Sequence, residues 1–100
     1  MVVLTAHCYF KPEMREIGLE MCEKDRVGSL LEPGCEEFGY YIDPADENHV
    51  IFVELWESRQ HLQAHFDGEL FGEFMGVMET AVAKPPEVTI YSVDGIELME

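Results

Sequence analysis

The sequence predicts an α+β fold, a ferredoxin-like sandwich with the element order β-α-β-β-α-β. Two observations lead to this fold class. A chain of 100 residues has room for one hydrophobic core. Four short segments rich in β-branched and aromatic residues alternate with two longer stretches whose apolar residues recur every three or four positions. This order gives an antiparallel four-stranded sheet with both helical segments packed on one face.

The first strand and the first helix are predicted at residues 2–10 and 13–31. Leu4 and Ala6 share one face of the strand, while Thr5 and His7 share the other. The Lys-Pro pair at 11–12 ends the strand, because proline suits the first turn of a helix. The apolar stripe of the helix is formed by Met14, Ile17, Met21 and Leu31.

The next two strands are predicted at residues 35–42 and 50–56, as a hairpin with a long polar loop between them. Asp, Pro and Asn residues mark this loop as a turn region. Glu54 lies in mid-strand between Phe52 and Trp56. Burying a bare carboxylate costs several kcal/mol, so Glu54 needs either solvent or a partner. We expect it to bond across a subunit interface.

The second helical segment is predicted in two parts, followed by the last strand. Ser58 is a suitable N-cap for a short helix, and Asp67 is expected to cap the longer one after the Asp-Gly interruption. The longer helix carries a steady apolar stripe that includes Leu70, Phe71, Phe74, Met75 and Met78. The last strand spans residues 87–93. We expect one domain over residues 1–100, with a core at 2–93 and a tail at 94–100.

Composition excludes several classes of partner. Six basic and 21 acidic residues give a formal charge of −15, so neither nucleic acid nor an anionic membrane surface is an expected partner. No apolar run reaches the ~20 residues of a membrane span, and the N-terminus lacks the features of a signal peptide. Three cysteines without a paired spacing indicate reduced thiols in a cytoplasmic protein, not a metal site.

Both faces of the predicted strands carry apolar side chains, although the helices can cover only one of them. A second copy of the chain that packs sheet against sheet would cover the other face. The sequence therefore predicts a homodimer, a dimeric α/β barrel.

The most specific motif is Glu-Leu-Trp-Glu-Ser at 54–58, followed by His-Leu-Gln-Ala-His-Phe at 61–66. This sequence motif resembles that of the antibiotic biosynthesis monooxygenase family of small dimeric α+β barrels. The resemblance implies a monooxygenase that adds O2 to an electron-rich aromatic small molecule, such as a quinol or an anthrone, without a flavin, haem or metal. No cofactor is therefore expected.

Such chemistry needs an apolar slot for the ring, a base that works near neutral pH and donors for a developing oxyanion. His65 and His7 are the candidate catalytic residues, since histidine ordinarily titrates near pH 7. His7 and Thr5 point from the first strand toward what we expect to be the same cleft. The candidate substrate-binding residues are Thr5, Trp56, Phe66, Phe71, Phe74 and Met75. His49 and His61 are expected to be exposed and are assigned no role.

Two alternatives stay open. The chain could be a non-catalytic small-molecule-binding or stress-response dimeric module, because a pocket and a histidine suit both functions. The resemblance also includes haem-degrading members, which use an asparagine, a tryptophan and a histidine. Aligning on Leu62 and Phe71 places Thr5, His65 and Met75 at or near those positions, so none of the three is kept and haem degradation is the weaker alternative.

Overall fold

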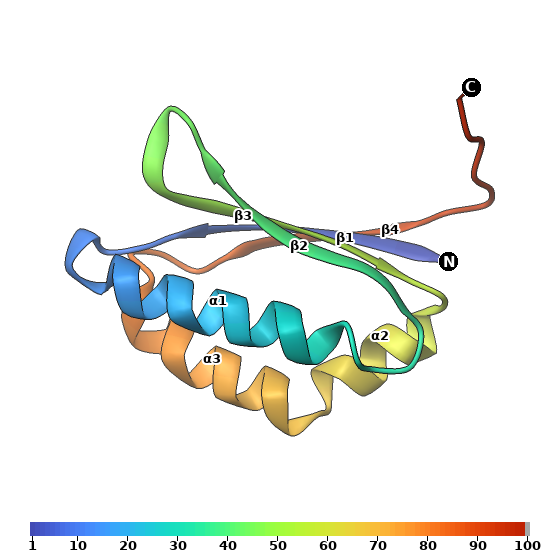
Figure 1. Ribbon diagram of the computed structural model, residues 1–100, viewed down its shortest axis with the longest axis horizontal. Helices are drawn as coiled ribbons and strands as arrows, with labels where there is room; N and C mark the ends of the chain where they lie inside the picture. Colours follow the sequence, from blue (N-terminus) through green and yellow to red (C-terminus); the bar gives the residue numbers. More distant parts are fainter. Residues whose placement is uncertain (100) are drawn as a thin grey trace.

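A computed structural model describes residues 1–99 as one sheet covered by helices on one face (Figure 1). The strands are β1 (Val2–Tyr9), β2 (Cys35–Asp43), β3 (Asp46–Trp56) and β4 (Glu87–Ser92). Their order in the sheet is β2-β3-β1-β4, and every neighbouring pair is antiparallel. This order confirms the predicted α+β, ferredoxin-like fold.

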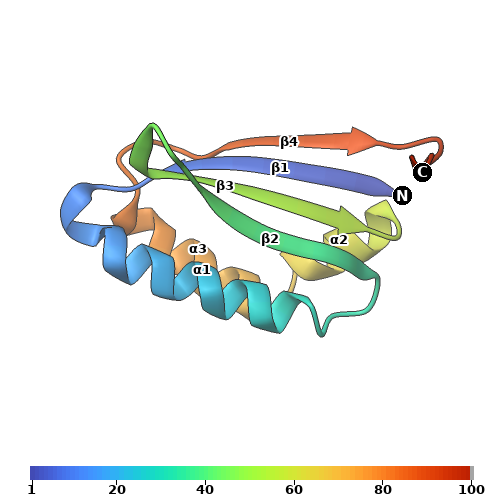
Figure 2. The same cartoon turned by 45° about the horizontal axis from the view of Figure 1, so that its top comes forward.

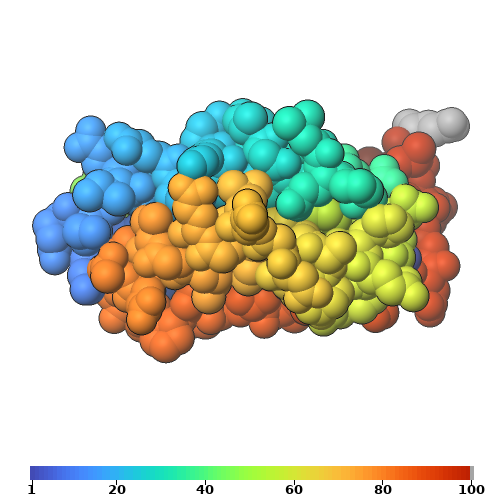
Figure 3. All heavy atoms as spheres, turned by 90° about the horizontal axis from the view of Figure 1, so that it is seen from below, coloured from blue at the N-terminus to red at the C-terminus, as the bar shows by residue number. Residues whose placement is uncertain are grey.

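The helical layer lies on one face of the sheet (Figures 1 and 3). It consists of a 3-10 turn, η1 (Pro12–Met14), and three helices: α1 (Arg15–Ser29), α2 (Arg59–Phe66) and α3 (Glu69–Ala81). Helices α1 and α3 run side by side, with α2 at one end of the layer. The second helical segment is therefore split in two, as predicted.

Alternation along the strands creates an inner face toward the helices and an outer face without a cover. On β1, Leu4 and Ala6 are buried on the inner face, whereas Thr5 and His7 are only half-buried on the outer face. The partners of Leu4 and Ala6 on β3 are Glu54 and Phe52, so the same face continues across the sheet. A carboxylate thus stands in the centre of an otherwise apolar layer.

The hairpin between β2 and β3 is tighter than the sequence indicates. Asp43 pairs with Asp46, so only two residues, Pro44 and Ala45, form the turn. The Asp43 carboxylate accepts a hydrogen bond from the backbone N–H of Ala45 at 2.8 Å, an Asx-type contact that stabilises a short turn. The prediction of a long loop is wrong, because the polar residues 46–49 belong to strand β3 and not to the loop.

Two helix predictions also need correction. Gly68, not Asp67, is the N-cap residue of α3. Of the predicted apolar stripe, Ile17 is exposed on α1, and Leu31 lies beyond the end of this helix and is also exposed. The face that packs on the sheet instead carries small or polar residues as well as Met21: Gly18, Cys22, Asp25 and Ser29.

Strand β4 lies at the edge of the sheet beside β1, and all six of its residues are exposed (Figure 2). The chain from Asp94 to Met99 has no regular structure. Glu100, the last residue of the predicted tail, lies outside the described residues. Within residues 1–99, no helix combines the length and the apolar character needed to cross a membrane.

Candidate functional site

A cavity of about 470 Å³ lies between the inner face of the sheet and helices α2 and α3. This volume is in the range of small-molecule sites. Met75 and Val88 border the cavity and are both exposed, so its mouth is between α3 and β4. The lining is almost entirely apolar or aromatic except at three ionisable side chains, and it consists of Leu4, Ala6, Cys8, Asp25, Phe52, Glu54, His65, Phe66, Phe71, Phe74, Met75, Pro86 and Val88.

His65 is the basic group of this cavity. It is 3% exposed, and its Nδ1 lies 2.6 Å from Oε1 of Glu32. An ionised carboxylate can only accept, so Nδ1–H donates to Glu32 and leaves Nε2 without a proton in the neutral ring. Nε2 has no hydrogen-bond partner within residues 1–99. The imidazole is thus oriented with an available proton acceptor.

Aromatic rings surround His65 on several sides. Its ring centroid lies 4.8 Å from that of Trp56, 5.3 Å from Phe71, 5.8 Å from Phe66 and 5.9 Å from Phe38. These rings fix the imidazole in one orientation and keep water away from it. A base in such a site is preorganised for proton transfer from a bound aromatic molecule.

Glu54 faces the same cavity from β3. It is 5% exposed, and its Oε1 accepts a hydrogen bond of 2.9 Å from Nε1–H of Trp56. Burial raises the pKa of Glu54 to about 8; the bond from Trp56 opposes this rise, and nearby Asp25 and Glu32 add to it. The expected bond across a subunit interface is wrong, because Glu54 lies on the helix-covered face and its partner is in the same chain.

Asp25 is the third ionisable group of the lining. It is 2% exposed on α1, and the Ser29 hydroxyl donates to its Oδ1 at 3.0 Å. Burial raises the pKa of Asp25 to about 6, although Ser29 and His65 both lower it. Asp25 was not among the predicted site residues, because the apolar pattern alone was used to predict the buried face of this helix. Its spacing of four from Ser29 was the available signal.

The structure brings five predicted site residues together and separates three. His65, Phe66, Phe71, Phe74 and Met75 all border the cavity. Trp56 does not line it; with 0% exposure, it packs behind His65 and cannot stack on a ligand without rearrangement. Thr5 and His7 lie on the opposite face of the sheet, so the expectation that they share this cleft is wrong. Because successive side chains of a strand point to opposite faces of the sheet, Thr5 and His7 point away from the cavity that Leu4 and Ala6 border.

Comparison with known proteins agrees with this architecture. The family model described as antibiotic biosynthesis monooxygenase matches residues 1–77. The chain belongs to the antibiotic biosynthesis monooxygenase family. The match includes the strand that carries Glu54 and the helix that carries His65.

The individual relatives of this chain have low sequence identity to it. An uncharacterized protein of Synechocystis, sll1783, is 30% identical over 92% of this chain, which spans 63% of that relative's length. A crystal structure described as an antibiotic biosynthesis monooxygenase superposes with a TM-score of 0.88 at 23% identity, covering 95% of this chain and 100% of the other. Rv0793 from Mycobacterium tuberculosis gives 0.89 at 18% identity, covering 96% and 98%. At these identities, the two superpositions show the fold.

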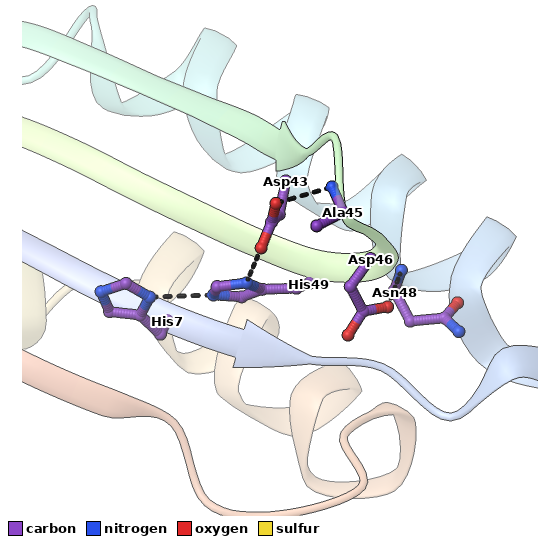
Figure 4. Close-up of polar contacts among 6 residues, drawn as sticks. All are labelled: His7, Asp43, Ala45, Asp46, Asn48 and His49. Carbon is purple, nitrogen blue, oxygen red and sulfur yellow. Dashed lines mark hydrogen bonds and ion pairs between the residues drawn. The ribbon is translucent and has the colours of Figure 1, made fainter.

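His7 takes part in a separate polar chain on the outer face (Figure 4). Its Nδ1 lies 2.8 Å from Nε2 of His49, whose Nδ1 lies 2.9 Å from Oδ2 of Asp43. The ring of Tyr9 stacks on His49 with centroids 4.3 Å apart. His49 is 9% exposed, so the expectation that it is exposed is wrong. These hydrogen bonds connect β1 to the β2–β3 hairpin.

The positions compared with haem-degrading members of the family do not converge in space. His65 and Met75 border the cavity, whereas Thr5 lies on the outer face. Within residues 1–99, no group of three or more His, Cys, Asp and Glu side chains is arranged to hold a metal ion. The site is therefore described best by its apolar walls, one histidine and two buried carboxyl groups.

Proposed function

We propose that this chain is a cofactor-independent monooxygenase that oxidises an electron-rich aromatic small molecule of the quinol or anthrone type with O2. The observation that carries the proposal is the position of His65, which lines an aromatic-walled cavity and whose Nε2 has no hydrogen-bond partner among the described residues. Phe66, Phe71 and Phe74 give this cavity flat apolar walls that suit a planar ring. The family match supports the same chemistry.

For an anthrone, the proposed reaction begins with transfer of a ring-bound C–H proton to Nε2 of His65, while the electron pair stays on the carbon. One electron then passes to O2, and the resulting superoxide combines with the carbon radical to form a C–O bond. The resulting peroxide anion takes up the proton held by His65 and becomes a hydroperoxide. A base then removes the second C–H proton from the same carbon as the O–O bond breaks, so the C–H electron pair forms the carbonyl and the departing hydroxide takes up a proton to become water. One oxygen atom enters the quinone product and the other becomes water.

Glu32 has a positioning role in this proposal. Its carboxylate holds Nδ1–H of His65, which fixes the tautomer and stabilises the imidazolium that forms after proton transfer. Glu32 lies outside the lining residues, so it does not contact the substrate. The ring of Trp56 packs against the imidazole of His65 and helps to hold it in place.

The direct test is O2 consumption by metal-free protein with 1,8-dihydroxyanthrone. We expect catalysed uptake above the buffer rate, with the anthraquinone as product. Substituting His65→Gln removes the base, so kcat should fall by about 100-fold or more. His61→Gln is the matched control: it changes a histidine on the same helix that bonds to Ser58 and does not border the cavity.

Two results would contradict this function. An uptake rate equal to that of buffer with anthrone, dihydroxyanthrone and a naphthohydroquinone would leave a binding module as the surviving alternative. Unchanged kcat in His65→Gln would remove His65 as the base even if oxidation occurs.

The same proposal includes a homodimer in a reducing, cytoplasmic compartment. Exposed apolar side chains on the outer face include Tyr41, Val53 and Tyr91, a surface that a second copy would cover. The three free cysteines are compatible with a reducing compartment. The single-domain boundaries at residues 1–100 belong to this proposal as well.

A further inference from the structure

Glu54 is a buried acid without an obvious charge partner. It lines the cavity with 5% exposure, and no Lys or Arg belongs to the lining. The groups that face it are Asp25 from α1, Glu32 after α1, His65 from α2, Cys8 from β1 and Cys35 from β2. Of these only His65 can become positive, and its Nδ1 is already engaged with Glu32.

The two oxygens of Glu54 have different environments. Oε1 accepts from Trp56 Nε1–H, whereas Oε2 has no hydrogen-bond partner within residues 1–99. Trp56 is fully buried and therefore holds the carboxyl group in a fixed direction. An ionised carboxylate here would lack compensation in an apolar wall, a state that costs several kcal/mol. The neutral acid avoids this cost: Oε1 keeps the hydrogen bond from Trp56, and the O–H on Oε2 then needs one hydrogen-bond acceptor.

We propose that Glu54 is a neutral carboxylic acid that donates a hydrogen bond to an oxygen of the aromatic guest, so that the cavity selects planar aromatics bearing a carbonyl or hydroxyl oxygen. This inference deepens the proposed function. Its catalytic part rests on that function: the O–H of Glu54 would also stabilise the oxyanion that forms when His65 removes a proton from the substrate. The raised pKa of Glu54, about 8, agrees with this protonation state near neutral pH.

The guest chemistry follows from the positions of the two groups. Glu54 and His65 border one cavity, one as a donor and the other as an acceptor. A molecule with an acidic C–H or O–H and a conjugated oxygen on the same flat ring system would engage both. Quinols and anthrones have this pair of features, whereas a plain hydrocarbon ring has neither.

Equilibrium binding of 9-fluorenone and fluorene tests the proposal. Both are planar and lack a group that ionises in the range used, but only fluorenone has a carbonyl acceptor. In the wild type, fluorenone should bind about tenfold more tightly than fluorene at pH 7, as expected for one hydrogen bond. This preference should disappear by pH 9.5, where Glu54 is ionised and has no O–H to donate.

Variants assign the effect to one residue. Glu54→Gln keeps an N–H donor and cannot ionise, so its preference for fluorenone should persist at both pH values. Glu54→Leu has no donor and should show no preference at either. Asp25→Asn removes the other buried acid of the lining; the loss of preference should remain but move to lower pH, because Asp25 contributes to the raised pKa of Glu54. Fluorene binding reports whether each variant keeps the cavity intact.

The infrared carbonyl band of bound fluorenone gives an independent measurement. It should shift to lower wavenumber in the wild type at pH 7 and not in Glu54→Leu, a difference that a purely structural role of Glu54 would not produce. Equal affinities for the two ligands at pH 7, a preference that ignores pH in the wild type, or a pH step that persists in Glu54→Gln would each overturn the proposal. So would failure of both ligands to bind. Because fluorenone is not a substrate for oxidation, these results are separate from the O2-uptake test.

Discussion

At the scale of single residues, the cavity combines one histidine with two carboxyl groups that burial keeps protonated to a higher pH than usual. Asp25 and Glu54 are each within a few per cent of full burial. Their raised pKa values have the same main cause, desolvation of the charged form. Perturbed acids in an apolar cavity are typical of functional sites, because structure alone gains little from them.

Glu54 should make the stability of the protein depend on pH. The pKa of Glu54 rises from an ordinary 4.5 to about 8 on folding. Between these values the folded chain binds more protons than the unfolded chain, so the free energy of unfolding falls as pH rises, by at most about 1.4 kcal/mol per pH unit. Urea unfolding of wild type and Glu54→Gln from pH 5 to 9 checks this.

The variant should gain stability relative to wild type as pH increases through this window. Asp25→Asn is the matched comparison, with its relative gain at lower pH, between an ordinary 3.8 and about 6. A stability difference between wild type and Glu54→Gln that stays constant from pH 5 to 9 would contradict the assignment.

Residue-level prediction from sequence succeeded where periodicity governs direction. The three- and four-residue spacing of α3 placed Phe71, Phe74 and Met75 on one face, and the structure has them at the cavity. It failed for Thr5 and His7, because alternation shows which residues share a strand face and not which face the helices cover. The bond between Glu54 and Trp56 also depends on side-chain geometry that spacing does not specify.

At the scale of elements, α1 approaches the end of β1 closely. A Cβ built on Gly18 would lie 2.5 Å from Cε1 of Phe10. Phe10 is only 2% exposed, so its ring has little space to move away. Gly18 therefore sets the distance between this helix and the sheet.

Substituting Gly18→Ala should destabilise the protein, even though alanine favours helices. We expect a loss of about 1–3 kcal/mol from the clash. Gly76→Ala on α3 is the matched control: its Cβ meets nothing within 4 Å, so helix propensity should stabilise the protein by about 0.5–1 kcal/mol. Thermal or urea unfolding measures both. A stabilising Gly18→Ala would show that the helix can shift outward without cost.

Element positions were predicted well, but some ends were not. Strands and helices follow from local patterns, and Ser58 is indeed the N-cap of α2, accepting from the N–H of His61. The short β2–β3 turn was missed because residues 46–49 are polar and yet belong to β3, where Asp46 pairs with Asp43 and His49 pairs with Tyr9. The packed face of α1 was misassigned because small and polar residues at close contacts resemble solvent-exposed ones in a hydropathy pattern.

At the scale of the whole molecule, the uncovered outer face of the sheet is the main unpaired surface. Val3, Ile51 and Leu55 are half-buried there, beside the more exposed Val53. The formal charge of −15 per chain opposes association. Dimer formation through this face therefore needs apolar contact to outweigh charge repulsion.

Substituting Val53→Asp should dissociate the proposed dimer. Sedimentation equilibrium should give twice the 11.5 kDa chain mass for wild type and the single-chain mass for the variant, because the substitution introduces a carboxylate into the interface. Val27→Asp on α1, where Val27 is 50% exposed away from the sheet, should remain dimeric. Higher salt should tighten the wild-type dimer by screening repulsion. A monomeric wild type at all salt concentrations would refute the dimer.

Strand β1 separates two environments by the simple alternation of its side chains. Leu4, Ala6 and Cys8 border the cavity, while Thr5 and His7 face outward. Consequently, substitutions at neighbouring positions of β1 can alter the proposed guest selectivity and the proposed subunit pairing separately. Communication between the two surfaces would have to pass through a change in the twist of this shared strand.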